Sequence, residues 1–215
     1  MEGGSRAGLR ESAAAIVATK LWTTFVRRMV VMARDVRTPW PPVAPPFGAR
    51  FDLLRPEGLA DLYALRPELR FDDLRARLAS GDRCCAGRLG DRLVHAMWVA
   101  RGTGPLPYLG GELILDPGDL YVYDSFTPPS LRGRDLSSAC HLFVFERARA
   151  EGFHRVLGAV AVENRAGRRV LDKVGYQPIG TYRSVRLGSL GRIEARALGA
   201  APVPALVRRG RAAGI

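Results

Sequence analysis

The sequence predicts a mixed α/β (α+β) fold, in which helices flank a central sheet and a helical extension precedes it. The first observation is the order of elements between residues 119 and 176: a strand, an arginine-flanked glycine turn, a helix, a second strand and a short helix. The second is a pair of β-rich segments around Gly90-Asp91, which predicts a hairpin. A chain of 215 residues, 47% of them hydrophobic, can bury a sizeable core.

Residues 1–47 are predicted to form a helix and a proline-rich arm outside the main domain. Apolar residues recur at helical spacing from Ser12 to Met32, although Met29–Val36 could also continue into a first strand. Basic residues interrupt the apolar run, so neither a membrane span nor a secretory signal is expected. The favoured role of this helix is packing on the domain or on the partner of a homodimer. The alternative is peripheral contact with an anionic membrane.

The main domain is expected to span residues 48–199. Proline-rich residues 38–46 form a stiff linker before it, because proline cannot donate to a helix or a ladder. Residues 57–65 and 71–78 are predicted helices, bounded by proline and by Ser80-Gly81.

The hairpin is predicted from segments 83–89 and 92–101, with a loop at 102–107 and an extended piece at 108–115. A closing hairpin is expected from segments 181–187 and 193–198. Residues 200–215, rich in Ala, Pro and Arg, are predicted to form a flexible tail.

The alternating run 120–127 is a predicted strand, and Pro128-Pro129 ends it. The turn Leu131–Asp135 follows, and apolar residues recur at helical spacing over 136–149. The first N–H groups of a helix have no intrahelical partner, and the helix dipole adds positive charge at that end. With Arg132 and Arg134 beside it, this turn favours the binding of phosphate.

Residues 127–176 resemble the core of the GNAT superfamily, the Gcn5-related N-acyltransferases. The turn Arg132-Gly133-Arg134-Asp135-Leu136-Ser137 matches the family's Arg/Gln-x-x-Gly-x-Gly/Ala loop, apart from Asp135 and Ser137. Residues 164–176 match the motif Asn-x-x-Ala-x-x-Leu-Tyr-x-Lys-x-Gly-Phe at Asn164, Lys173, Gly175 and Tyr176. The resemblance covers residues 83–190 and implies a mostly antiparallel central sheet flanked by helices.

The resemblance also implies a cofactor, acetyl-CoA or another acyl-CoA, and no metal. The backbone of the strand end would hold the pantetheine arm, and the turn would hold the pyrophosphate. The residues expected to bind the cofactor are Ser125, Phe126, Thr127, Arg132, Gly133, Arg134, Asp135, Leu136, Ser137, Ser138, Asn164 and Lys173. Asp135 would cap the helix, but its carboxylate would oppose a pyrophosphate unless Arg132 or Arg134 neutralised it.

Acyl transfer to an amine also needs a proton acceptor and a donor for the leaving thiolate. Asp124 and Tyr123 are the expected catalytic residues, because they lie on the strand beside the expected thioester. Strand alternation places Tyr123 and Asp124 on opposite faces. Leu171 stands where many family members have the tyrosine that protonates the thiolate, and Tyr176 is considered as its replacement.

The net charge of +12 permits an anionic partner, yet nearly all of it is arginine in an Ala-, Gly- and Pro-rich chain. No nucleic-acid motif is present, so no specific nucleic acid is expected. The odd set Cys84, Cys85 and Cys140 is not a disulfide framework and favours a reduced, cytoplasmic location.

The leading hypothesis is an acyl-CoA-dependent N-acetyltransferase that acts on an amine of a small molecule, such as an amino sugar or another metabolite. The alternative is a non-catalytic acyl-CoA-binding or regulatory domain that keeps the fold, which Asp135 and Leu171 favour. A basic nucleic-acid-binding protein ranks third.

Overall fold

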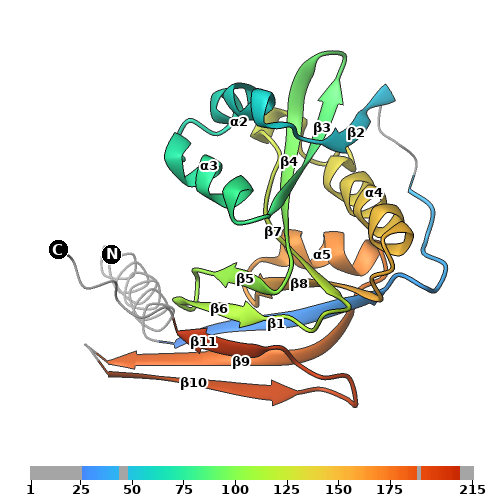
Figure 1. The fold of residues 1–215 in the computed structure, drawn as a ribbon. Helices are drawn as coiled ribbons and strands as arrows, with labels where there is room; N and C mark the ends of the chain where they lie inside the picture. Colours follow the sequence, from blue (N-terminus) through green and yellow to red (C-terminus); the bar gives the residue numbers. More distant parts are fainter. Residues whose placement is uncertain (1–25, 44–47, 188–189, 209–215) are drawn as a thin grey trace, which may run out of the picture.

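The computed structural model describes residues 26–43, 48–187 and 190–208. Within these ranges, the centre of the molecule is an eight-stranded sheet with the order β10-β9-β1-β8-β7-β4-β3-β2 (Figure 1). Its strands are β1 (Val26–Asp35), β2 (Arg50–Leu53), β3 (Arg83–Leu89), β4 (Arg92–Ala100), β7 (Asp119–Phe126), β8 (Arg155–Ala161), β9 (Gln177–Leu187) and β10 (Leu190–Ala197). In that part of the chain, β7 and β8 pair in parallel and all other neighbours in this sheet are antiparallel. The prediction of a mixed α/β fold with a mostly antiparallel central sheet flanked by helices is confirmed.

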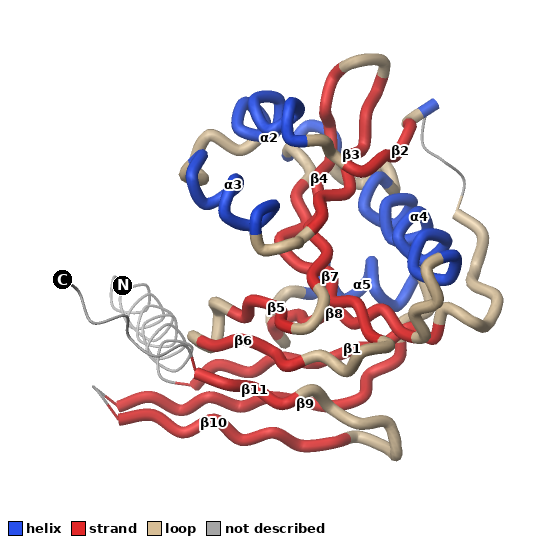
Figure 2. The backbone as a smooth tube through the Cα atoms, in the orientation of Figure 1, coloured by secondary structure: helices blue, strands red, loops and turns tan. Residues whose placement is uncertain are grey.

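The two faces of the sheet are covered differently (Figures 1 and 2). On β3 and β4, alternate residues such as Cys85 and Met97 pack towards the helix α4, whereas Cys84 and Trp98 pack towards α2 and α3. A small sheet covers the β1 and β8 part of this second face. The helices are α2 (Leu59–Leu65), α3 (Phe71–Ala79), α4 (Leu136–Ala150) and α5 (Arg165–Lys173).

The strand β1 corrects the expectation for the N-terminal segment. It pairs with β8 on one side and β9 on the other. A helix reaching Met32 was favoured there, and the alternative of a strand at Met29–Val36 agrees with β1. Val30 and Met32 pack on the α4 side and Met29 and Val31 on the opposite side, so both faces of the strand are buried. A strand buried on both faces is a continuous apolar run, which spacing alone does not distinguish from a helix.

The boundary expected at residue 48 is therefore wrong, because the sheet already includes residues 26–35. The predicted helix at 12–25 lies outside the described residues. Residues 38–43 have no regular structure, in agreement with the predicted linker. This linker packs on α4, where the Trp40 ring lies 5.6 Å from that of Phe145.

A second sheet corrects two further expectations. The predicted loop at 102–107 contains the strand β5 (Thr103–Leu106), which pairs with β6 (Gly111–Ile114). The predicted flexible tail contains β11 (Ala205–Arg208), which pairs with β6 on its other side. The strand β11 has a partner distant in sequence, and both β5 and β11 bury apolar residues against β1 and β8, so local pattern does not reveal them.

Candidate functional site

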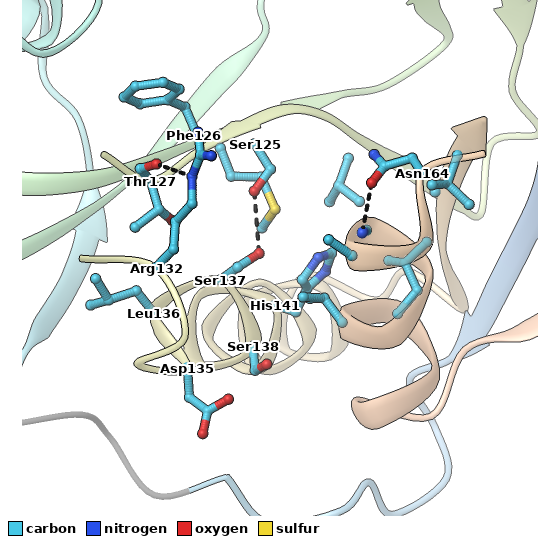
Figure 3. Close-up of a pocket in the computed structure, with 18 of the residues that line it drawn as sticks. Ser125, Phe126, Thr127, Arg132, Asp135, Leu136, Ser137, Ser138, His141 and Asn164 are labelled. Atoms are coloured by element: carbon cyan, nitrogen blue, oxygen red, sulfur yellow. Dashed lines mark hydrogen bonds between the residues drawn. The ribbon is translucent and has the colours of Figure 1, made fainter. Parts of the chain in front are cut away.

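A pocket of about 620 Å³ opens where β7 and β8 part. The two strands pair from Asp119 and Arg155 as far as Val122 and Gly158, and beyond that point residues of both line the pocket. The turn after β7, the start of α4 and the start of α5 close its other sides (Figure 3). Of the residues expected to bind the cofactor, these line it: Ser125, Phe126, Thr127, Arg132, Gly133, Arg134, Asp135, Leu136, Ser137, Ser138 and Asn164.

A β-bulge distorts β7 beside this pocket. Tyr123 pairs with Trp98 and Phe126 with Ala96, so Asp124 and Ser125 together oppose one residue of β4. Asp124 has a left-handed backbone with φ of 47°. The bulge breaks strand alternation, so the prediction that Tyr123 and Asp124 face opposite ways is wrong: Arg77 of α3 contacts both side chains.

The carboxylate of Asp124 is held by two guanidinium groups. Arg66 Nη1 donates to it at 3.0 Å and Arg77 Nη1 at 2.6 Å. Burial alone would raise the pKa of Asp124, but these two hydrogen bonds hold it below its ordinary value. A carboxylate stabilised as an anion accepts protons poorly, so the expected role of Asp124 as general base is corrected to that of a structural anchor.

Tyr176 lies in the core, away from the pocket lining. Its hydroxyl is 3.1 Å from Nδ1 of His141, and its ring packs against Phe145. Tyr176 is 1% exposed, and burial raises its pKa well above the usual value. The prediction that Tyr176 protonates a leaving thiolate is therefore wrong.

The turn between β7 and α4 lines the pocket. Arg132 Nε donates to the carbonyl of Thr127 at 3.1 Å, which fixes the guanidinium beside the end of β7 (Figure 3). Gly133 has a φ of +74°, a conformation that favours glycine. The Ser125 and Ser137 hydroxyls form a hydrogen bond of 3.2 Å, which joins the end of β7 to the first turn of α4 (Figure 3). Unpaired N–H groups at the start of α4 and the neighbouring arginines suit an anionic group.

Asp135 does not cap α4 with its side chain, although it occupies the N-cap position. It has a left-handed backbone (φ 58°), and its carboxylate accepts from Lys173 Nζ at 2.6 Å, pointing away from the pocket (Figure 3). Lys173, expected to bind the cofactor, is absent from the pocket lining and instead neutralises Asp135. Arg132 and Arg134 were expected in that role.

Replacing Asp135 with glycine should stabilise the protein and tighten acyl-CoA binding. Glycine adopts left-handed φ without strain, which should contribute about 1 kcal/mol and outweigh the loss of an exposed ion pair. Loss of the carboxylate should strengthen acetyl-CoA binding by about 2- to 5-fold at low salt. Thermal unfolding and calorimetric titration measure both effects.

Asp135→Asn is the matched control, because asparagine tolerates the left-handed conformation but carries no charge. It should reproduce the gain in affinity without the gain in stability. Weaker acetyl-CoA binding by both variants would show that the Asp135 carboxylate assists the ligand rather than opposing it.

Asn164 lies both at the start of α5 and in the pocket lining. Its side-chain oxygen accepts from the backbone N–H of Gly167 at 2.9 Å, which caps α5, and it also lines the pocket.

His141 was missed as a pocket residue. It lies one helical turn after Ser137, on the same face of α4, and that spacing is the signal that could have found it. Burial and the nearby His95 lower the pKa of His141 to about 3, so it is neutral at pH 7.

No helix in the described ranges is long and apolar enough to cross a membrane. In the same part of the chain, no group of three or more His, Cys, Asp or Glu residues is placed to hold a metal ion.

Comparison with known proteins agrees with this fold. No family model matches the chain. A stretch of 60 residues is 32% identical to phosphinothricin N-acetyltransferase of Streptomyces coelicolor, covering 28% of this chain and 35% of that protein.

Three solved structures share the fold. A GCN5-related N-acetyltransferase from Sphaerobacter thermophilus has a TM-score of 0.56 at 19% identity, over 78% of this chain and 56% of that one. A GNAT-family acetyltransferase from Novosphingobium aromaticivorans has a TM-score of 0.53 at 16% identity, over 74% and 62%. The glucosamine N-acetyltransferase region of a fungal multi-domain β-N-acetylglucosaminidase has a TM-score of 0.55 at 14% identity, over 80% and 22%. The chain thus spans about a third to three fifths of the first relatives it matches, and it has the GNAT fold.

Proposed function

We propose that this protein is an acyl-CoA-dependent N-acyltransferase, with acetyl-CoA as the expected donor. It would transfer the acyl group to an amine of a small molecule, such as an amino sugar or another metabolite. The observation that carries the proposal is the pocket between the parting strands β7 and β8, which ends at the basic turn and the start of α4.

The pocket residues suit the parts of an acyl-CoA. The start of α4, with Arg132 and Arg134 beside it, would bind the pyrophosphate. The backbone at the end of β7, where the bulge interrupts the ladder, would bind the extended pantetheine arm and polarise the thioester carbonyl. Ser137 and Asn164 would add hydrogen bonds from the two flanking helices.

Two of the similar proteins are named as N-acetyltransferases, one of phosphinothricin and one of glucosamine, which supports an amine acceptor. This chain covers only part of each, so the acceptor is proposed as a class. The cytoplasmic location, the homodimer and the membrane contact of the N-terminal segment stay predictions.

The test is thermal unfolding of the protein with and without acetyl-CoA and longer acyl-CoAs. A ligand at 100 times its dissociation constant should add about 2.7 kcal/mol, which raises the midpoint by about 5–10 °C. Release of the coenzyme A thiol should then be followed with a panel of primary amines. A rise in midpoint without transfer would support the non-catalytic alternative, and no rise with any acyl-CoA would overturn both readings.

A further inference from the structure

Tyr123 and Asp82 form a hydrogen-bonded pair at the point where β7 and β8 part. Tyr123 is the first residue of β7 beyond its last pair with β8, and it lines the pocket. Its hydroxyl donates to the carboxylate of Asp82, which lies between α3 and β3. Both residues are partly exposed.

The phenol ring of Tyr123 is fixed by its neighbours. It stacks on Tyr121 with ring centroids 6.0 Å apart and on Trp98 at 6.4 Å. The guanidinium of Arg77 lies over the same ring at 5.4 Å, while its Nη1 is bound to Asp124. This packing and the hydrogen bond to Asp82 fix the position of the hydroxyl group.

The charges around Asp82 differ from those around Asp124. The Tyr123 hydroxyl of β7 donates to Asp82, and the charges of Arg77 on α3 and Glu112 on β6 act on its carboxylate. Burial and the charge of Glu112 raise the pKa of Asp82, whereas the Tyr123 hydrogen bond and the charge of Arg77 lower it. The resulting pKa lies above the ordinary value of an aspartate. Asp124 is held as an anion, whereas Asp82 remains able to take up a proton.

We propose that Tyr123, backed by Asp82, accepts the proton of a cationic amine acceptor and so generates the nucleophile. This inference rests on the proposed function and assigns its missing base. Tyr123 touches the acceptor, and Asp82 acts through it as a positioning and proton-holding residue.

The step balances in protons and electrons. One N–H bond of the ammonium breaks as its proton passes to the Tyr123 oxygen, and the Tyr123 proton passes to Asp82. The nitrogen lone pair then forms a C–N bond with the thioester carbonyl carbon, and the C–S bond breaks. A second nitrogen proton passes to the departing thiolate, and Asp82 returns its proton to solvent. The products are an amide, the free thiol and one proton.

The experiment compares wild type with Asp82→Asn and Tyr123→Phe, using acetyl-CoA and the most active amine of a panel containing glucosamine, spermidine and lysine amide. Each variant should lower kcat about 100-fold, the lower end of general-base effects, with the KM for acetyl-CoA unchanged. The double variant should lose no more, because the pair acts as a unit. Asp82→Glu should restore part of the rate. Asp91→Asn, at the exposed β3–β4 turn, is the matched control.

The pH profile separates proton transfer from a merely structural role. The wild-type rate should fall as pH drops through the raised pKa of Asp82, and Asp82→Asn should lose this acid limb. Glu112→Gln should move the limb to lower pH, because Glu112 raises the pKa of Asp82.

Each outcome decides a different point. Asp82→Asn and Tyr123→Phe with wild-type rates and profiles would overturn the inference and leave the acyltransferase intact. Acetyl-CoA binding without transfer to any amine would overturn it together with the enzymatic reading. No acetyl-CoA binding would overturn the proposed function itself.

Discussion

Replacing Arg132 with alanine should weaken acetyl-CoA binding by about 10- to 100-fold. Arg132 lines the pocket beside the start of α4, and its Nε holds the carbonyl of Thr127 at 3.1 Å. A hydrogen bond to a charged group contributes about 1.5–3 kcal/mol, which corresponds to that range of affinity. Calorimetric titration at several salt concentrations measures the loss, and the wild-type affinity should itself fall as salt rises.

Two further variants sharpen this test. Arg132→Lys keeps the charge but loses the planar donor group, so it should recover only part of the affinity. Arg92→Ala removes one exposed positive charge at the β3–β4 turn, outside the pocket, and should bind like wild type. Equal losses for Arg92→Ala and Arg132→Ala would show that net charge alone attracts the ligand.

Replacing Asp124 with alanine should destabilise the protein by about 3 kcal/mol, since it leaves Arg66 and Arg77 without their shared partner. Alanine also tolerates the left-handed backbone poorly. The midpoint of thermal unfolding should therefore fall by about 6–12 °C. Asp124→Asn keeps the backbone tolerance and removes the charge, so it should lose most but not all of this stability.

The contribution of Asp124 should also depend on pH. Its folded-state pKa is lowered, so the stabilisation is fully present above the unfolded pKa of about 3.9 and is lost as pH falls through the folded pKa. The stability difference between wild type and Asp124→Asn should therefore shrink in acid. If the stabilities of wild type and Asp124→Asn differ by less than about 0.5 kcal/mol at pH 7, the Asp124 carboxylate does not act as a structural anchor.

Strongly periodic segments were predicted well. The helix at 136–149, the short helix expected before Tyr176 and the hairpin around Gly90 match α4, α5 and the β3–β4 pair. In these segments the local apolar spacing and the turn residues agree with the packing found, so local pattern was sufficient. The position of the basic turn was also predicted correctly. The N–H groups without an intrahelical partner belong to the helix start itself, so they do not depend on distant residues.

The sequence by itself determined the order of strand, basic turn and helix, and with it the basic side of the pocket. Tertiary structure alone decided the rest of the site. A bulge in β7 turned Asp124 towards two arginines, Lys173 was drawn to Asp135, and Asp82 was brought to Tyr123 from 41 residues away. The physical reason is that backbone pattern is local, whereas the pairing of charges depends on which distant side chains the sheet brings together. The same holds for β1. Its apolar run forms a strand because β8 and β9 supply backbone hydrogen-bond partners on both of its sides.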